Sequence, residues 1–184
     1  MKKKLALILS IILLTTAVMP MALNVSAANA APNVLPAIRE WTGGTGNFTP
    51  NASTVLVNAS GVDKQIDMVA QFFQEMAGLD LAVKTSGSSN AIVFTLDSSL
   101  KSKVGEEGYT INATSSKIDI KAPTKIGLLY GGISVVQSVY ADGYFPCGTA
   151  TDYPAYSKRT GMIDVARAYV PMEELNKITR YMSW

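Results

Sequence analysis

The sequence predicts an α+β fold in which two helices pack on a mixed β-sheet, within residues 31–143. Two observations favour this class. Short runs with alternating apolar and polar residues recur between turn residues, which is typical of strands. Two longer segments have apolar residues at spacings of three and four, which is typical of helices that lie on a sheet. The order along the chain is β-α-β-β-β-β-α.

The first βα pair is expected at residues 55–78. A strand is predicted at Val55–Val57, after a segment rich in Gly, Pro, Asn and Thr that predicts turns around short extended pieces. Ser60 is expected to cap the following helix, and Gly78 stands where a helix commonly ends. The predicted buried face of this helix consists of Val62, Ile66, Val69, Phe73 and Met76.

The next strands and the second helix follow from the same patterns. Strands are predicted in residues 79–85 and 90–97, and a hairpin has Tyr109–Ala113 and Ile118–Ala122 as its arms. The second helix is expected from Thr124 to Gly143, with a face made of Ile126, Leu129, Ile133, Val136 and Tyr140. Gly127, Gly131 and Gly132 lie inside it. Each costs about 1 kcal/mol relative to Ala, which indicates that another backbone approaches the helix closely.

The first 30 residues have the pattern of a secretory signal peptide. Three Lys precede an apolar run from Leu5 to Leu14, and two groups of small residues suit cleavage, Val25-Ser26-Ala27 and Ala28-Asn29-Ala30. The alternative is an uncleaved membrane anchor, since residues 5–23 are nearly long enough to span a bilayer. Pro20 and the small residues weigh against it. We expect a secreted protein with no stable membrane anchor after cleavage.

Composition excludes several classes of function. Residues 1–30 hold three of the 16 Lys+Arg and none of the 14 Asp+Glu, so the remainder carries 13 basic and 14 acidic residues, a net charge of −1. This balance gives no case for nucleic-acid binding. The chain has no His and one Cys, which excludes disulfides, Ser-His-Asp sites and the usual zinc clusters. No cofactor or metal is expected, and Cys147 is expected to be a packed side chain rather than a nucleophile.

The C-terminal residues predict the beginning of a second domain. Residues 144–156 are expected to be a connector, followed at 157–184 by a short buried strand, "GMID", and a helix that has Pro171 in its first turn. A single βα unit cannot bury its apolar face alone. A (β/α)8 TIM barrel takes about 250 residues, so we expect the first unit of a truncated barrel. The alternative is that the helix docks back on the first domain.

These residues resemble glycoside hydrolase family 20, the β-N-acetylhexosaminidases and their relatives such as lacto-N-biosidases. Arg159, Met162, Ile163, Asp164 and Arg167, followed by "PMEELNKITRYMS", are similar to the first strand and helix of the family's catalytic barrel. The stretch "EEGYTINATSSKIDIKAPTKIGLLYGGISVVQSVY" resembles the second half of the family's small N-terminal domain. The stretch "VLPAIREWTGGTGNFT" is similar to the opening strand of that domain.

The resemblance implies a substrate-assisted retaining hydrolysis that removes terminal GlcNAc or GalNAc, with a Glu as general acid/base beside an Asp that orients the acetamide group. No Asp-Glu dipeptide occurs in the chain, so we expect no catalytic residue in it and no activity of the chain alone. Arg159 matches the Arg that binds the 3- and 4-hydroxyls of the sugar. The alternatives are that Arg159 pairs with Asp164 or caps a strand edge. Asp164 and Arg167 match a structural ion pair, and Ala168 stands where many relatives have His.

A second function remains open, namely a non-catalytic accessory or binding module of a secreted carbohydrate-active protein. Trp41, Tyr144 and Tyr153 are candidates for stacking on sugars, although packed aromatic residues are commoner. The adjacent carboxylates Glu106-Glu107 and Glu173-Glu174 are expected to be solvated, because neighbours on a strand or helix point apart.

Overall fold

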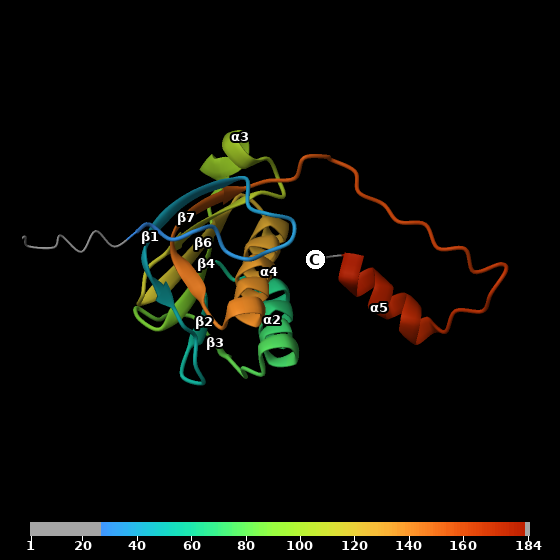
Figure 1. Cartoon of the computed structure of the whole chain (residues 1–184), viewed down its shortest axis with the longest axis horizontal. Coiled ribbons are helices and arrows are strands. Elements are labelled where there is room, and N and C mark those ends of the chain that lie inside the picture. Colours follow the sequence, from blue (N-terminus) through green and yellow to red (C-terminus); the bar gives the residue numbers. More distant parts are fainter. Residues whose placement is uncertain (1–26, 183–184) are drawn as a thin grey trace, which may run out of the picture.

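The computed structural model describes residues 27–182, most of which form one seven-stranded mixed sheet with helices on it (Figure 1). The strands are β1 (Glu40–Phe48), β2 (Val55–Asn58), β3 (Ala82–Lys84), β4 (Ala91–Leu96), β5 (Tyr109–Ala113), β6 (Lys117–Ala122) and β7 (Phe145–Asp152). The helices are α2 (Asp63–Phe72, continued by a π-helical turn, Phe73–Ala77), α3 (Lys101–Val104, after a 3-10 turn, Ser98–Leu100), α4 (Lys125–Asp142) and α5 (Met172–Met182). The predicted β-α-β-β-β-β-α order matches β2-α2-β3-β4-β5-β6-α4, except that the short helix α3, which the sequence did not predict, lies between β4 and β5.

The sheet has the strand order β1-β7-β5-β6-β4-β2-β3. Neighbours are parallel from β6 through β4 and β2 to β3, and antiparallel from β6 through β5 and β7 to β1. The predicted hairpin is present, with Ile111 opposite Ile120. The sheet is therefore mixed, as the sequence predicted.

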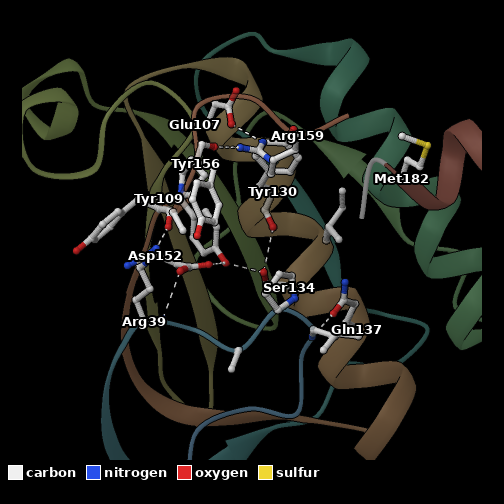
Figure 2. A pocket seen from close by; sticks show the side chains of 17 residues that line it. Arg39, Glu107, Tyr109, Tyr130, Ser134, Gln137, Asp152, Tyr156, Arg159 and Met182 are labelled. Atoms are coloured by element: carbon white, nitrogen blue, oxygen red, sulfur yellow. Dashed lines mark hydrogen bonds and ion pairs between the residues drawn. The ribbon is translucent and has the colours of Figure 1, made fainter. Parts of the chain in front are cut away.

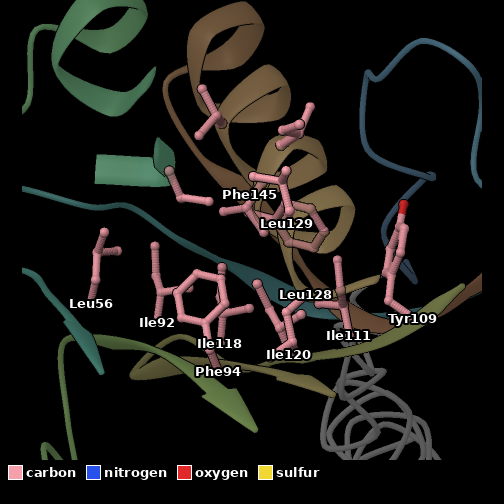
Figure 3. Close-up of a cluster of buried hydrophobic side chains, with 14 of the residues drawn as sticks. Leu56, Ile92, Phe94, Tyr109, Ile111, Ile118, Ile120, Leu128, Leu129 and Phe145 are labelled. Carbon is pink, nitrogen blue, oxygen red and sulfur yellow. The ribbon is translucent and has the colours of Figure 1, made fainter. Parts of the chain in front are cut away.

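Helices α2 and α4 lie side by side on one face of the sheet, and the hydrophobic core fills the space between (Figures 1 and 3). The predicted face of the first helix is correct for Val62, Ile66, Val69 and Phe73, all of which are buried, while Met76 is partly buried. The predicted Ser60 cap is wrong, because no described side chain caps the first turn of α2. Asn58 Oδ1 accepts the N–H of Val62 at 2.8 Å, whereas Ser60 Oγ accepts the N–H of Leu96.

Helix α4 is buried around most of its circumference, so the predicted apolar face is only partly right. Ile126 and Tyr140 are exposed, and the burial extends to Leu128, Val135 and Val139. Two glycines inside α4 explain why this helix lies so close to its neighbours. A Cβ on Gly127 would lie 2.4 Å from the carbonyl oxygen of Gly108, and a Cβ on Gly132 would lie 2.5 Å from a methyl of Val69. Only glycine lets α4 approach both neighbours this closely, as the sequence indicated.

The segment that was expected to be a connector, residues 144–156, instead contains β7, a strand between β1 and β5. The segment was interpreted as a turn-rich connector that contains Pro146 and Pro154. The structure accommodates Pro146 within the strand because β1 is irregular beside its partner. The register shifts between Gly43 and Asn47, and Pro146, which has no N–H, lies opposite Asn47 beside this shift. The expected packing of Cys147 is confirmed, and its burial raises the pKa of the thiol.

After β7, residues 153–171 form neither helix nor strand, so the buried strand predicted at Gly161–Asp164 is not present. Met162 is 96% exposed. The physical reason is that a parallel strand needs neighbours to receive its backbone hydrogen bonds, and no described strand lies beside it. The predicted helix does form as α5, which stands apart from the sheet in Figure 1 and has no buried residue. Its Arg180 pairs with Glu75 and lies 4.9 Å from the ring centre of Phe72.

We expect residues 157–171 to exchange their amide hydrogens fast, because they are exposed and make few backbone hydrogen bonds. The amides of β5 and β6, in the middle of the sheet, should exchange slowest. Hydrogen exchange followed by mass spectrometry of peptides would measure both. Protection of residues 157–171 equal to that of β5 would show that this segment is ordered by contacts that the structure does not contain.

The predicted signal peptide lies mostly outside the described residues, which begin at residue 27. Residues 27–30, expected to belong to it, are described, and Asn29 is hydrogen-bonded to β1. Over residues 27–182, no helix combines the length and the apolar character needed to cross a membrane.

Candidate functional site

A pocket of about 450 Å³ lies where helix α4, the end of β7 and the segment before β1 meet the beginning of the C-terminal segment (Figure 2). One wall comes from residues 35–39, which are anchored because Gln137 Oε1 on α4 accepts the N–H of Leu35 at 2.8 Å. The opposite wall comes from residues 153–159 and from Met182. The volume is within the usual range of small-molecule sites, about 300–1,000 Å³.

The floor of the pocket is a chain of hydrogen bonds between three elements, drawn as dashed lines in Figure 2. Tyr109 on β5 donates its hydroxyl proton to Asp152 Oδ2 at 2.9 Å, and its oxygen lies 2.6 Å from Ser134 Oγ on α4. Burial, and then the charge of Asp152, raise the pKa of Tyr109, so this phenol stays neutral and remains a donor. Asp152 Oδ1 also accepts the N–H of Arg39 at 3.3 Å. A carboxylate offers about four lone-pair positions, so Asp152 keeps acceptor capacity for a ligand.

Two arginines lie at the pocket, and each already has partners. Arg39 donates from Nε to the carbonyl of Tyr153 at 2.7 Å, and its guanidinium lies 4.7 Å from the centre of the Tyr153 ring. This contact identifies Tyr153 as a packed aromatic residue. Tyr144 does not line the pocket, and Trp41 packs edge-on against Phe145. The aromatic side chain left open at this site is Tyr156, which is 75% exposed and was not singled out from the sequence.

Arg159, the predicted sugar-binding residue, lies at the rim of the pocket and is paired with Glu107. Its Nη2 is 2.5 Å from Glu107 Oε2, and its Nη1 donates to the carbonyl of Tyr156 at 2.8 Å. The hydrogen bond to Glu107 raises the pKa of Arg159 above its ordinary value. Both alternatives considered from the sequence, a pair with Asp164 and the cap of a strand edge, differ from this geometry. Glu106 and Glu107 were both expected to be solvated. Glu107 instead pairs with Arg159, whereas Glu106 is exposed and pairs with Lys101.

Asp164 and Arg167 form an ion pair, with 2.6 Å between Asp164 Oδ2 and Arg167 Nη2. Asp164 Oδ1 also accepts the N–H of Ala166, and this hydrogen bond, followed by the one from Arg167, lowers the pKa of Asp164. The pair closes a turn between the irregular segment and α5, and it lies in an exposed stretch away from the pocket lining. In residues 27–182, no group of His, Cys, Asp and Glu has the arrangement of a metal site.

Residues 31–153 match the family model described as glycosyl hydrolase family 20, domain 2. The chain belongs to glycosyl hydrolase family 20. It corresponds to an N-terminal portion of the family, as the sequence predicted, and the matched residues include β7, which the sequence had placed outside the first domain.

Two named relatives are similar to the chain over most of its length. Lacto-N-biosidase of Bifidobacterium bifidum is 30% identical over 130 residues, which cover 70% of this chain and 12% of that protein. β-N-acetylhexosaminidase of Cellulomonas fimi is 28% identical over 153 residues, or 78% of this chain and 30% of that protein. The chain thus spans less than a third of the length of either relative.

Solved structures of family 20 share the fold. The β-N-acetylhexosaminidase of Streptomyces coelicolor A3(2) superposes with a TM-score of 0.72 at 22% identity, covering 84% of this chain and 33% of that one. The exo β-N-acetylglucosaminidase of Vibrio harveyi, in complex with N-acetylglucosamine, also gives 0.72 at 18% identity, over 85% and 24%.

Proposed function

We propose that the chain is the N-terminal part of a secreted β-N-acetylhexosaminidase-type glycosidase, which removes terminal GlcNAc or GalNAc by substrate-assisted retaining hydrolysis. The observation that carries the proposal is the match of residues 31–153 to family 20, followed directly by the pattern from Arg159 to Arg167. The small share of each relative that the chain spans supports it as well. The sheet with α2 and α4 is then an accessory domain, and residues 157–184 contribute the first βα unit of a TIM barrel.

In this proposal Arg159 binds the sugar in the complete protein. Its pair with Glu107 forms only while the rest of the barrel is absent. A guanidinium is a rigid fork of five donors, which suits two adjacent hydroxyls as well as it suits a carboxylate. In this geometry two of these donors are already in use, because Nη2 donates to Glu107 and Nη1 to the carbonyl of Tyr156. Assembly of the barrel would replace these partners, and the catalytic Asp-Glu pair would come from later strands.

Reading the nucleotide sequence beyond codon 184 tests this proposal. We expect the frame to continue through seven further βα units and to encode an adjacent Asp and Glu near the end of the fourth strand. A stop codon directly after Trp184 in the native gene would contradict the proposal for this protein.

The pocket favours a second candidate function, in which the domain binds a neutral saccharide without hydrolysing it. Its two guanidinium groups, Arg39 and Arg159, are balanced by the carboxylates of Asp152 and Glu107, so the pocket favours no net charge in a ligand. Asp152 offers acceptors for hydroxyl groups, and the open ring of Tyr156 offers a face for the C–H groups of a sugar. A saccharide has both features that these side chains suit, hydroxyl groups and an apolar face of C–H groups.

Substitution of Tyr156 by Ala tests this binding. We expect N-acetylglucosamine to shift the NMR signals of residues around Asp152 in the unmodified chain, and the variant to weaken the affinity about tenfold, the cost of one lost stacking contact. Tyr169→Ala is the matched control, because Tyr169 is 88% exposed in the same irregular segment and does not line the pocket. Equal affinities of the two variants, or no shifts at all, would rule out the pocket as a saccharide site.

A further inference from the structure

Asn29, the third described residue of the chain, is hydrogen-bonded to the irregular edge of the sheet. Its N–H donates to the carbonyl of Gly44 at 2.8 Å, and its side-chain Nδ2 donates to the carbonyls of Gly46, at 2.6 Å, and Cys147, at 3.0 Å. Its own carbonyl accepts the indole N–H of Trp41 at 3.0 Å. One residue thus makes four hydrogen bonds to β1 and β7.

These four bonds occur where the β1–β7 ladder is interrupted. The register shifts between Gly43 and Asn47, so Gly44 and Gly46 are paired with no residue of β7. Their carbonyl groups instead accept hydrogen bonds from Asn29. A Cβ on Gly43 would lie 2.1 Å from the carbonyl oxygen of Asn29, so this glycine makes room for the residue. Without Asn29, three carbonyls and the Trp41 indole would lose their partners.

The position of Asn29 distinguishes the two cleavage sites that the leader sequence offers. Cleavage after Ala30 would remove Asn29 together with the leader, whereas cleavage after Ala27 would keep it. Ala27 and Ala28 are exposed, while Asn29 is half-buried. We propose that signal peptidase hydrolyses the Ala27–Ala28 bond, so that the mature protein begins at Ala28. This inference rests on the leader being a signal peptide, as in the proposed function, and does not depend on glycosidase activity.

The products of this cleavage suit the structure. Water adds across the Ala27–Ala28 amide and leaves a carboxylate on Ala27 and an ammonium group on Ala28. The new charge on Ala28 remains in solvent, and the N–H of Asn29 remains an amide that donates to Gly44. Cleavage three residues later would place the ammonium group on Ala31 and open the edge of the sheet.

The mass of the mature protein tests the proposal. The chain would be expressed with its own leader in a secreting bacterial host, and the N-terminus of the exported protein would be determined by intact mass and N-terminal sequencing. We expect the sequence to begin Ala-Asn-Ala-Ala-Pro, from Ala28. A terminus at Ala31, or export of unprocessed protein, would overturn the proposal, and neither result bears on whether a longer protein hydrolyses N-acetylhexosaminides.

The thermal stability of two forms of the chain, one that begins at Ala28 and one that begins at Ala31, tests whether Asn29 stabilises the domain. The form that begins at Ala31 should melt at least about 4 °C below the form that begins at Ala28, because several hydrogen bonds are lost together. Asn29→Ala should lower Tm in the same direction, while Asn33→Ala, at an exposed position in the same segment, should leave it unchanged. Equal melting temperatures of the Ala28 and Ala31 forms would show that Asn29 contributes nothing to the domain.

Discussion

Substitution of Gly127 by Ala is expected to destabilise the domain by about 2–3 kcal/mol, although Ala is the better helix former by about 1 kcal/mol. The added Cβ would lie 2.4 Å from the carbonyl oxygen of Gly108 and 2.8 Å from the Cβ of Ala122. Neither atom can rotate away, because one is backbone and the other is fixed to it. The helix α4 must therefore move off the sheet, and packing along its length is lost.

Gly132→Ala is the control for this prediction. At that position the nearest atoms belong to side chains, a methyl of Val69 at 2.5 Å and the ring of Phe94 at 3.1 Å, which can shift more easily than a backbone carbonyl. We expect a smaller loss of stability, and a less than additive loss when Gly132→Ala is combined with Val69→Ala, which removes the obstructing methyls. Urea unfolding of the variants measures these differences. A Gly127→Ala variant as stable as the unmodified chain would show that helix propensity outweighs the contact with Gly108.

Substitution of Arg159 by Ala is expected to lower kcat/KM about a hundredfold or more in a protein that continues past Trp184 into a complete barrel. In the proposed function Arg159 binds two sugar hydroxyls, and the variant would lose these charge-assisted hydrogen bonds. Arg159→Lys should recover little, because an ammonium group lacks the planar fork. The measurement is steady-state hydrolysis of an aryl N-acetylglucosaminide.

Glu107→Gln provides the matched control for Arg159. Glu107 pairs with Arg159 in this structure, but it lies before β5, and the proposed hydrolysis assigns it no contact with the sugar. We expect kcat/KM of this variant to stay close to that of the parent enzyme. An Arg159→Ala variant within about twofold of the parent, a difference of under about 0.5 kcal/mol, would exclude a sugar contact.

The spacing of apolar residues correctly predicted the elements that have one buried face. The face of α2 follows from its spacing, and the hairpin of β5 and β6 follows from strict alternation around Ile111 and Ile120. Helix α4 is apolar on most sides, so periodicity could not identify which residues contact the sheet. Strand β7 was missed because its segment is rich in turn residues and contains Pro146, and the register shift in β1 beside the partner of Pro146 is not visible in the sequence.

The pocket could not be predicted for a different reason, since its residues are distant in sequence. Tyr109 reaches Ser134 25 residues away and Asp152 43 residues away, and Glu107 meets Arg159 across 52 residues. Each side chain alone has the appearance of an ordinary surface or boundary residue. The signal that was available is the stretch of residues 106–140 that resembles the family's N-terminal domain, since it contains Glu107, Tyr109 and Gln137, which line this pocket.

The most direct test of the assignment is the hydrolysis of an aryl N-acetyl-β-glucosaminide by two purified proteins. One is the chain of 184 residues, and the other continues in frame past Trp184. We expect no turnover by the first, because it has no Asp-Glu pair, and turnover by the second. Turnover by the 184-residue chain, or inactivity of the folded longer protein, would contradict the assignment of this domain to a family 20 glycosidase of that type.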